Sequence, residues 1–153
     1  MRVILCSEDQ INVLARLFND YRIFYEHPSD LESCRAFVKN NLVNNRSRLF
    51  LVSDTNGMPV GFAQIYSAIS SLSMLHYYYL SDLYIDKSAR GNGYSRDLMN
   101  FITDFCATEG AERLTLDTAI SNKIAQNLYE SLGYKREEVY VTYHQRLPCK
   151  KIE

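Results

Sequence analysis

The sequence predicts a mixed α/β domain in which a central sheet is flanked by helices. Apolar runs at Arg2–Cys6, Arg48–Ser53 and Ser73–Asp86 have the length and composition of strands. Other segments repeat apolar residues every three to four positions, as amphipathic helices do. The length of 153 residues and the 46% of hydrophobic residues suit one domain with its own core, so we expect a single domain over residues 1–153.

Composition and charge exclude several classes of protein. The net charge of -1 gives no support to nucleic-acid binding through a broad basic face. No window approaches the roughly 18 apolar residues of a membrane span, and Met1–Cys6 is too short for the apolar core of a signal peptide. The cysteines and histidines lack metal-ligand spacing. We therefore expect a cytoplasmic protein with no metal, nucleic acid or membrane partner.

The N-terminal half is predicted to contain a strand, two helices and a hairpin. After the first strand, Ser7–Gln10 has the spacing of a capping box and begins a helix. Pro28–Glu32 ends that helix and caps a second one. Asp54–Gly57 supplies the turn from the next strand into a strand at Val60–Ser67, in which we expect Gly61 to mark a bulge.

The C-terminal half is predicted to alternate strands and helices. A helix follows Gly93, and Arg113–Asp117 is a buried strand that this order makes parallel to the strand before the helix. Ser121 caps a further helix, and Gly133 closes it. Val139–Arg146 alternates as a final strand near a sheet edge. Because proteins rarely leave such an edge bare, we expect a homodimer.

The stretch from Leu83 to Leu98 reads as strand, glycine-containing loop and helix. Glycines let the backbone approach a ligand, and the first-turn N–H groups of a helix bind phosphate, with Arg90 as a nearby cation. By itself this pattern is equally compatible with an ordinary turn. It is not a P-loop, because no Gly-x-x-x-x-Gly-Lys-Ser/Thr exists, and Arg96 stands where a dinucleotide fingerprint has a small residue.

Two segments together resemble the GCN5-related N-acetyltransferase (GNAT) superfamily. Arg90-Gly91-Asn92-Gly93-Tyr94-Ser95 resembles its acetyl-CoA motif, Arg/Gln-x-x-Gly-x-Gly/Ala, although Ser95 replaces the final small residue. The segment from Asn122 to Tyr134 resembles Asn-x-x-Ala-x-x-Leu-Tyr-x-x-x-Gly-Tyr/Phe at every fixed position. The resemblance implies an α/β fold of the GNAT type, with a mixed, mostly antiparallel sheet of six to seven strands and about four helices.

The resemblance also implies an acetyl-CoA-dependent N-acetyltransferase. The backbone of Leu83–Ile85 would pair with the pantetheine arm, and an N–H of Leu83 or Tyr84 would polarise the thioester carbonyl. The amides of residues 90–95 would hold the pyrophosphate. The expected cofactor-binding residues are Leu83, Tyr84, Ile85, Arg90, Gly91, Asn92, Gly93, Tyr94, Ser95, Arg96, Asn122 and Tyr129.

Acetyl transfer to an amine needs an acid for the leaving thiolate and a base for the protonated amine. Tyr129 matches the family tyrosine that protonates the thiolate; its alternative role is a core aromatic. Asp82 matches an aspartate of the diamine enzymes and is the first candidate for the base, with a structural carboxylate as the alternative. The expected substrate-binding residues are Tyr25, Glu26, Tyr79 and Asp82.

Two segments are similar to particular groups within the superfamily. Tyr79–Ile85 and Tyr21–Glu26 are similar to the diamine (spermidine/spermine) acetyltransferases and to a yeast-type histone and polyamine group whose members also take D-amino acids. We therefore expect direct transfer to a primary amine of a small molecule, with a polyamine or an amino acid preferred. The alternatives are acetylation of a protein N-terminus or lysine, and a CoA-sensing domain without turnover.

Overall fold

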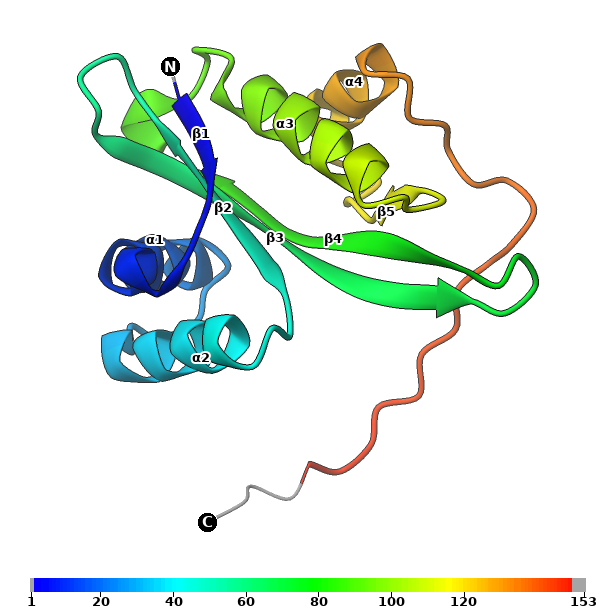
Figure 1. Cartoon of the computed structure of the whole chain (residues 1–153), viewed down its shortest axis with the longest axis horizontal. Helices are drawn as coiled ribbons and strands as arrows, with labels where there is room; N and C mark the ends of the chain where they lie inside the picture. The colour runs from blue at the N-terminus through cyan, green and yellow to red at the C-terminus, as the bar shows by residue number, and fades with distance from the viewer. Residues whose placement is uncertain (1, 150–153) are drawn as a thin grey trace. The chain divides into compact units, whose positions relative to one another are not determined.

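The computed structural model describes residues 2–149. The chain forms two compact units, Met1–Ala119 and Ile120–Glu153. The first unit contains one sheet and the helices α1, α2 and α3, and the second contains the helix α4 (Figure 1). No helix in the described part of the chain is long and apolar enough to cross a membrane.

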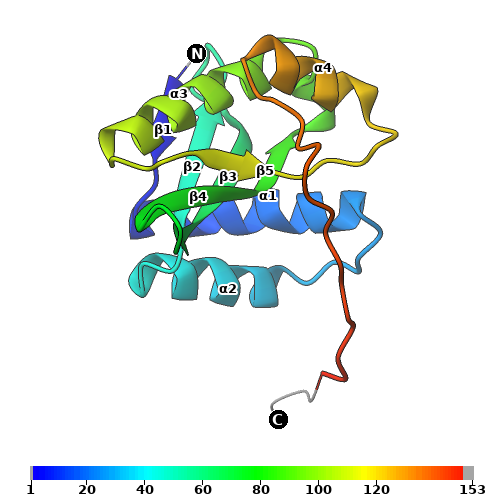
Figure 2. The same ribbon diagram turned by 90° about the vertical axis from the view of Figure 1, so that its right-hand side faces the viewer.

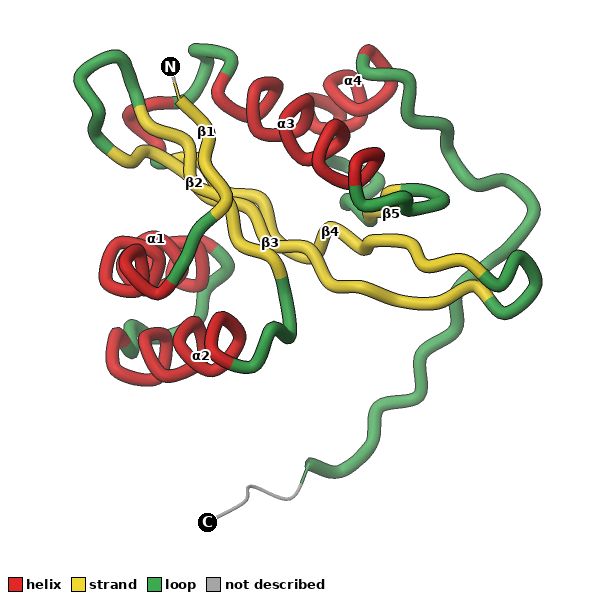
Figure 3. The backbone as a smooth tube through the Cα atoms, viewed as in Figure 1, coloured by secondary structure: helices red, strands yellow, loops and turns green. Residues whose placement is uncertain are grey.

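The five strands form one mixed sheet in the order β1-β2-β3-β4-β5 (Figure 3). The first four strands pair antiparallel, and β4 and β5 pair parallel, which confirms the predicted mixed and mostly antiparallel sheet. The strands are β1 (Arg2–Leu5), β2 (Arg48–Ser53), β3 (Pro59–Ser70), β4 (Leu75–Ile85) and β5 (Leu114–Leu116). The strand predicted at Arg113–Asp117 is β5, which is shorter than expected and half-buried instead of buried.

Helices cover both faces of this sheet. Figures 1 and 2 show α1 (Ile11–Phe24) and α2 (Leu31–Val43) against one face and α3 (Tyr94–Thr108) against the other. The predicted capping box at Ser7 is present and leads through a short 3-10 turn, η1 (Glu8–Gln10), into α1. Asp30 caps α2, because its carboxylate accepts a hydrogen bond from the N–H of Ser33 at 3.1 Å.

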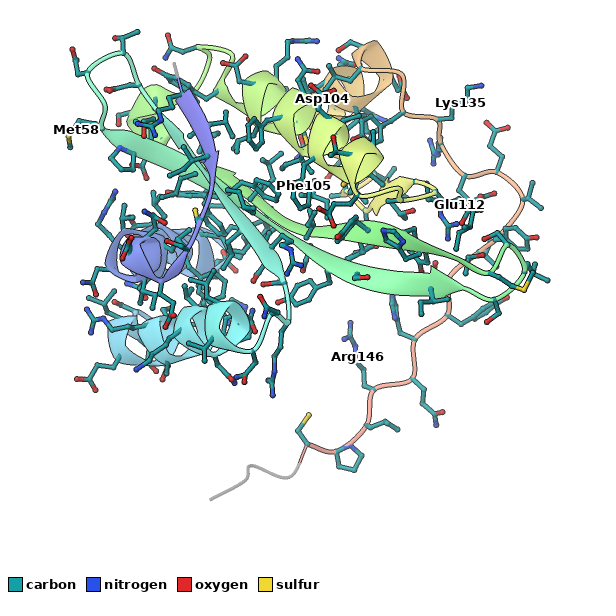
Figure 4. The ribbon with its side chains drawn as sticks, viewed as in Figure 1. Met58, Asp104, Phe105, Glu112, Lys135 and Arg146 are labelled. Atoms are coloured by element: carbon teal, nitrogen blue, oxygen red, sulfur yellow. The ribbon has the colours of Figure 1, made fainter. Side chains whose placement is uncertain are left out.

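Two apolar layers hold the unit together. On the α1 and α2 face, Leu14 and Leu17 pack with Phe62 of β3, and all three are fully buried. On the opposite face, the ring centroids of Phe50 of β2 and Phe105 of α3 lie 5.3 Å apart. Figure 4 shows the side chain of Phe105 between α3 and the sheet. Burial of each such side chain contributes about 1.5–3 kcal/mol.

The second unit begins with α4 (Lys123–Ser131). Its cap is Asn122, not the predicted Ser121, because the side-chain Oδ1 of Asn122 accepts a hydrogen bond from the N–H of Ala125 at 3.1 Å. The helix ends at Ser131, two residues before Gly133, as the sequence predicts.

The predicted strand at Val139–Arg146 is wrong. The segment is irregular, with Val141 and Tyr143 77% and 89% exposed. Its alternation is typical of a strand, but a strand needs a partner, and the Glu137 carboxylate instead accepts the N–H groups of Val139 and Tyr140 at 2.6 and 3.2 Å. The sheet of residues 2–149 therefore has five strands instead of six to seven.

Candidate functional site

A bulge interrupts the pairing of β3 and β4. Gln64 pairs with Asp82 and Ile65 with Leu80, so Ser81 is the extra residue of β4. The pairing of β5 with β4 also stops at Leu80. Within the described sheet, the rest of β4 therefore has only β3 as its partner strand. The interruption lies directly before Leu83–Ile85, the segment expected to pair with the pantetheine arm.

The edge of β4 that faces away from β3 carries the main-chain groups of Leu83 and Ile85. The N–H of Asp86 donates to the carbonyl of Val60 on β3 at 2.8 Å. Because successive residues of a strand point their main-chain groups to opposite sides, those of Leu83 and Ile85 point away from β3 and those of Tyr84 toward it. The carbonyl of Ile85 accepts a hydrogen bond from Arg90 Nε at 2.9 Å, as this direction requires. The N–H of Leu83 is thus aimed at the open edge.

Gly61 lets β3 approach this segment closely. A Cβ at Gly61 would lie 2.6 Å from the Tyr84 carbonyl oxygen and 2.4 Å from Ile85 Cδ1. The register of β2 and β3 shifts beside Gly61, between Val52 and Ser53, which agrees with the predicted bulge. Only glycine fits here without a backbone movement.

The loop after β4 leads into the N-terminus of α3. It passes through a 3-10 turn, η2 (Lys87–Ala89), and ends at Gly93, whose φ of 83° favours glycine. A Cβ at Gly91 or Gly93 would meet nothing within 4 Å, so space is open beside the loop. The Asn92 side chain donates to the carbonyls of Ala89 and Arg90 at 2.9 and 3.3 Å, which stiffens the loop. The first amides of α3 follow directly and suit an anion.

Arg90 joins this loop to the end of α1. Besides donating to Ile85, its guanidinium lies 4.7 Å from the ring centroid of Phe24 and 5.7 Å from that of Tyr84. The expected cation is therefore stacked on aromatic rings, a contact that stabilises the loop. Of the other predicted residues, Tyr94, Ser95 and Arg96 form the first turn of α3.

Asp82 lies in a polar network that the sequence did not reveal. Its Oδ2 accepts a hydrogen bond from Gln64 Nε2 at 2.8 Å. Burial, and then the charge of Asp82, raise the pKa of Tyr21 above its usual value. The missed signal is Gln64, a polar residue in an apolar strand, since buried polar groups need partners.

The predicted substrate-binding residues lie at different places around the end of α1 and on β4. The rings of Tyr21 and Tyr25 lie 5.1 Å apart, and the charge of Asp82 contributes to the raised pKa of Tyr21. The Tyr79 hydroxyl donates to Asp117 at 2.5 Å, which, together with burial, raises its pKa to about 12. The fourth residue, Glu26, is exposed at the end of α1 with a φ of 63°.

Comparison with known proteins decides the family. The sequence model of the Acetyltransferase (GNAT) family matches residues 13–134, most of the chain. This chain belongs to the GNAT family. The GNAT relatives include an uncharacterized N-acetyltransferase, YhfO, of Bacillus subtilis, which is 39% identical over 90% of this chain and 91% of its own length.

Two further GNAT relatives support the assignment. The crystal structure of a probable acetyltransferase superposes with a TM-score of 0.91 at 29% identity, covering 98% of this chain and 100% of that one. An aminoglycoside N(6')-acetyltransferase type 1 of Serratia marcescens is 23% identical over 95% of this chain and 99% of its own. The chain is therefore an acetyl-CoA-dependent acyltransferase with the GNAT fold.

The GNAT co-substrate fits the residues present. An acetyl-CoA molecule needs a strand edge for its pantetheine arm and the amides of a helix N-terminus for its pyrophosphate. Beyond Leu80, β4 has only β3 as its partner in the described sheet, and α3 begins directly after Gly93. No metal is needed for this chemistry, and residues 2–149 contain no group of His, Cys, Asp and Glu side chains that could hold one. The remaining two predicted site residues lie in the second unit. Asn122 caps α4 and Tyr129 lies within this helix, with its ring 6.0 Å from that of Tyr134.

Proposed function

We propose that this GNAT enzyme transfers the acetyl group of acetyl-CoA directly to a primary amine of a small molecule, with a polyamine or an amino acid as the preferred acceptor. The observation that carries the proposal is the Asp82 carboxylate beside the tyrosine rings at the open segment of β4. A carboxylate and aromatic faces both attract an ammonium group. The Serratia relative, named for acetylation of an aminoglycoside, supports a small amine as acceptor.

On the cofactor side, Leu83–Ile85 would pair with the pantetheine arm. The outward N–H of Leu83 favours Leu83 over Tyr84 as the donor to the thioester carbonyl. The amides of residues 90–95 would hold the pyrophosphate, with the Ser95 hydroxyl and Arg96 in the same turn and Asn122 as a further contact. The open space at Gly91 and Gly93 supports this arrangement.

The chemical step is direct aminolysis of a thioester. The amine nitrogen forms a bond to the thioester carbonyl carbon, and the carbon–sulfur bond breaks to release CoA thiolate. Asp82, directly or through a water molecule, takes the proton that the ammonium group must lose before attack. Tyr129 gives a proton to the thiolate, a role that rests on the family match between Asn122 and Tyr134. The nitrogen loses its second proton as the amide forms, and this proton restores the phenol of Tyr129. The substrate-binding roles of Tyr25, Glu26 and Tyr79 belong to the same proposal.

The test is the release of free thiol from acetyl-CoA with a panel of acceptors. The panel contains spermidine, L- and D-amino acids, an aminoglycoside and a peptide with a free N-terminus and a lysine. We expect a small amine to react with a higher kcat/KM than the peptide. Preference for the peptide would instead assign a protein acetyltransferase, and CoA binding by calorimetry without thiol release from any acceptor would assign a CoA sensor.

Two other expectations from the sequence stay predictions. They are the cytoplasmic location and the homodimer. The exposed apolar side chains in the second unit support the homodimer, because such groups commonly become buried in an interface. They are Val139, Tyr140, Val141, Tyr143 and Leu147.

A further inference from the structure

Gln64 is a buried amide in the middle of β3. Its side chain is only 1% exposed, and Ala63 and Ile65 beside it are fully buried. An amide in such a position is costly unless its donors and acceptors are paired. Here both ends are paired, which identifies Gln64 as part of a built network.

The acceptor end of Gln64 is held from two directions. Its Oε1 accepts hydrogen bonds from Asn41 Nδ2 of α2 at 2.8 Å and from Ser47 Oγ, just before β2, at 2.7 Å. Asn41 and Ser47 are themselves buried, 3% and 5% exposed. The Asn41 N–H group fixes the orientation of the amide, because a flipped amide would set its own N–H group against that donor and its oxygen against the Asp82 carboxylate.

The donor end of Gln64, its Nε2 group, hydrogen-bonds the neighbouring strand. Its Nε2 points across the sheet to Asp82 Oδ2 at 2.8 Å. The bulge at Ser81 sets this register, since it makes Asp82 the direct partner of Gln64.

We propose that Gln64 is a positioning residue that holds the Asp82 carboxylate toward the acceptor amine, and that Asn41 and Ser47 act through Gln64 by fixing its amide. This inference rests on the proposed function, in which Asp82 binds the amine and takes its proton. The network reaches Asp82 from α2 and from Ser47 before β2, and its hydrogen bonds involve no residue of the loop between β4 and α3. Its loss therefore changes the acceptor step and leaves binding of acetyl-CoA unchanged.

The variant that tests this is Gln64→Glu. The new carboxylate keeps the shape and the contacts to Asn41 and Ser47, but it sets a negative charge against Asp82. With spermidine, or the fastest amine of the panel, we expect kcat/KM for the amine to fall roughly a hundredfold, as for a displaced catalytic group. The KM for acetyl-CoA stays unchanged. Ser67→Ala, an exposed change on the same strand, is the matched control with wild-type kinetics.

A double variant separates positioning from a structural role. In the double variant Gln64→Glu with Asp82→Asn, the new amide at position 82 donates a hydrogen bond to the new carboxylate at position 64. We expect the melting temperature, which Gln64→Glu alone lowers, to return to the wild-type value, whereas kcat stays low. If Gln64→Glu does not fold, Ser47→Ala and Ser47→Thr replace it: the alanine variant loses activity toward the amine, and the threonine variant, which keeps the hydroxyl, regains it.

Two outcomes overturn different statements. Wild-type kcat in Asp82→Asn would remove Asp82 from the reaction and with it this part of the proposed function. Loss of kcat in Asp82→Asn together with wild-type kinetics in folded Gln64→Glu, or in both Ser47 variants, would leave the function intact and overturn the role of Gln64.

Discussion

Gly61 of β3 lies against Tyr84 of β4 so closely that a Cβ at Gly61 would come 2.6 Å from the Tyr84 carbonyl oxygen. The contact brings β3 against the segment at which the pantetheine arm is expected to pair. The glycine therefore links the packing of the sheet to the shape of the site.

Substitution of Gly61 by alanine is expected to disturb both. Overpacking against backbone typically costs about 1–3 kcal/mol of the free energy of unfolding, measurable by urea denaturation. Movement of β4 also raises the KM for acetyl-CoA. Gly57→Ala is the control: its Cβ meets nothing within 4 Å, so the φ of 82° lowers stability there but leaves that KM unchanged. An unchanged KM in Gly61→Ala would separate this contact from cofactor binding.

Arg90→Lys tests the stacked cation. Lysine keeps the charge but lacks the planar guanidinium that stacks on Phe24 and donates to the Ile85 carbonyl. We expect the dissociation constant of CoA, measured by calorimetry, to rise about tenfold, since about 1.4 kcal/mol of loop stabilisation corresponds to that factor. Arg113→Lys, which removes a guanidinium 3.8 Å from the Tyr77 ring, is the matched control. Equal effects of the two variants would contradict a special role for Arg90.

Tyr129→Phe tests the proposed acid. Removal of a positioned proton donor commonly lowers turnover about a hundredfold or more, whereas the phenyl ring preserves packing. We expect kcat to fall and the dissociation constant of CoA to stay as in the wild type. Tyr134→Phe in the same unit is the control. Wild-type turnover in Tyr129→Phe would remove the residue from the reaction.

The raised pKa of the Tyr79 hydroxyl predicts that the protein loses folding stability at alkaline pH. Its hydrogen bond to Asp117, followed by burial, raises its pKa from 10.0 to about 12. The folded state therefore holds this proton more tightly than the unfolded state, so the contribution to stability is complete below pH 10.0 and is lost as the pH rises to about 12. Tyr79→Phe should lower the melting temperature at neutral pH and reduce its fall over this alkaline range. Tyr77→Phe on the same strand provides the comparison, and identical alkaline profiles of the two variants would contradict the prediction.

The predicted homodimer has its own test. Sedimentation equilibrium of the full chain is expected to give twice the monomer mass. Val141→Asp with Tyr143→Asp, at positions that are 77% and 89% exposed, should give the monomer mass because charges do not enter an apolar interface. Thr142→Asp, between them, is the control. A monomer in the wild-type chain would refute the dimer.

Local patterns in the sequence predicted much of the fold. The capping box at Ser7, the cap within Pro28–Glu32 and the glycine before α3 depend on residues a few positions apart, so the chain alone reveals them. The motifs from Arg90 to Ser95 and from Asn122 to Tyr134 likewise identified the family that the comparison confirms. The same local reasoning failed at Val139–Arg146, because alternation shows a preference for extended backbone but supplies no partner strand.

Only the tertiary structure decided the surroundings of the site. The hydrogen bond between Gln64 and Asp82 depends on a one-residue bulge, and moving the register by one residue would turn side chains to the other face. The stacking of Arg90 on Phe24 joins a loop to a distant helix. The sequence by itself thus determined the family, the presence of the helices and the approximate bounds of four of the five strands, because their signals are periodic or local. Contacts between distant residues follow from strand register and helix packing, which no single segment contains.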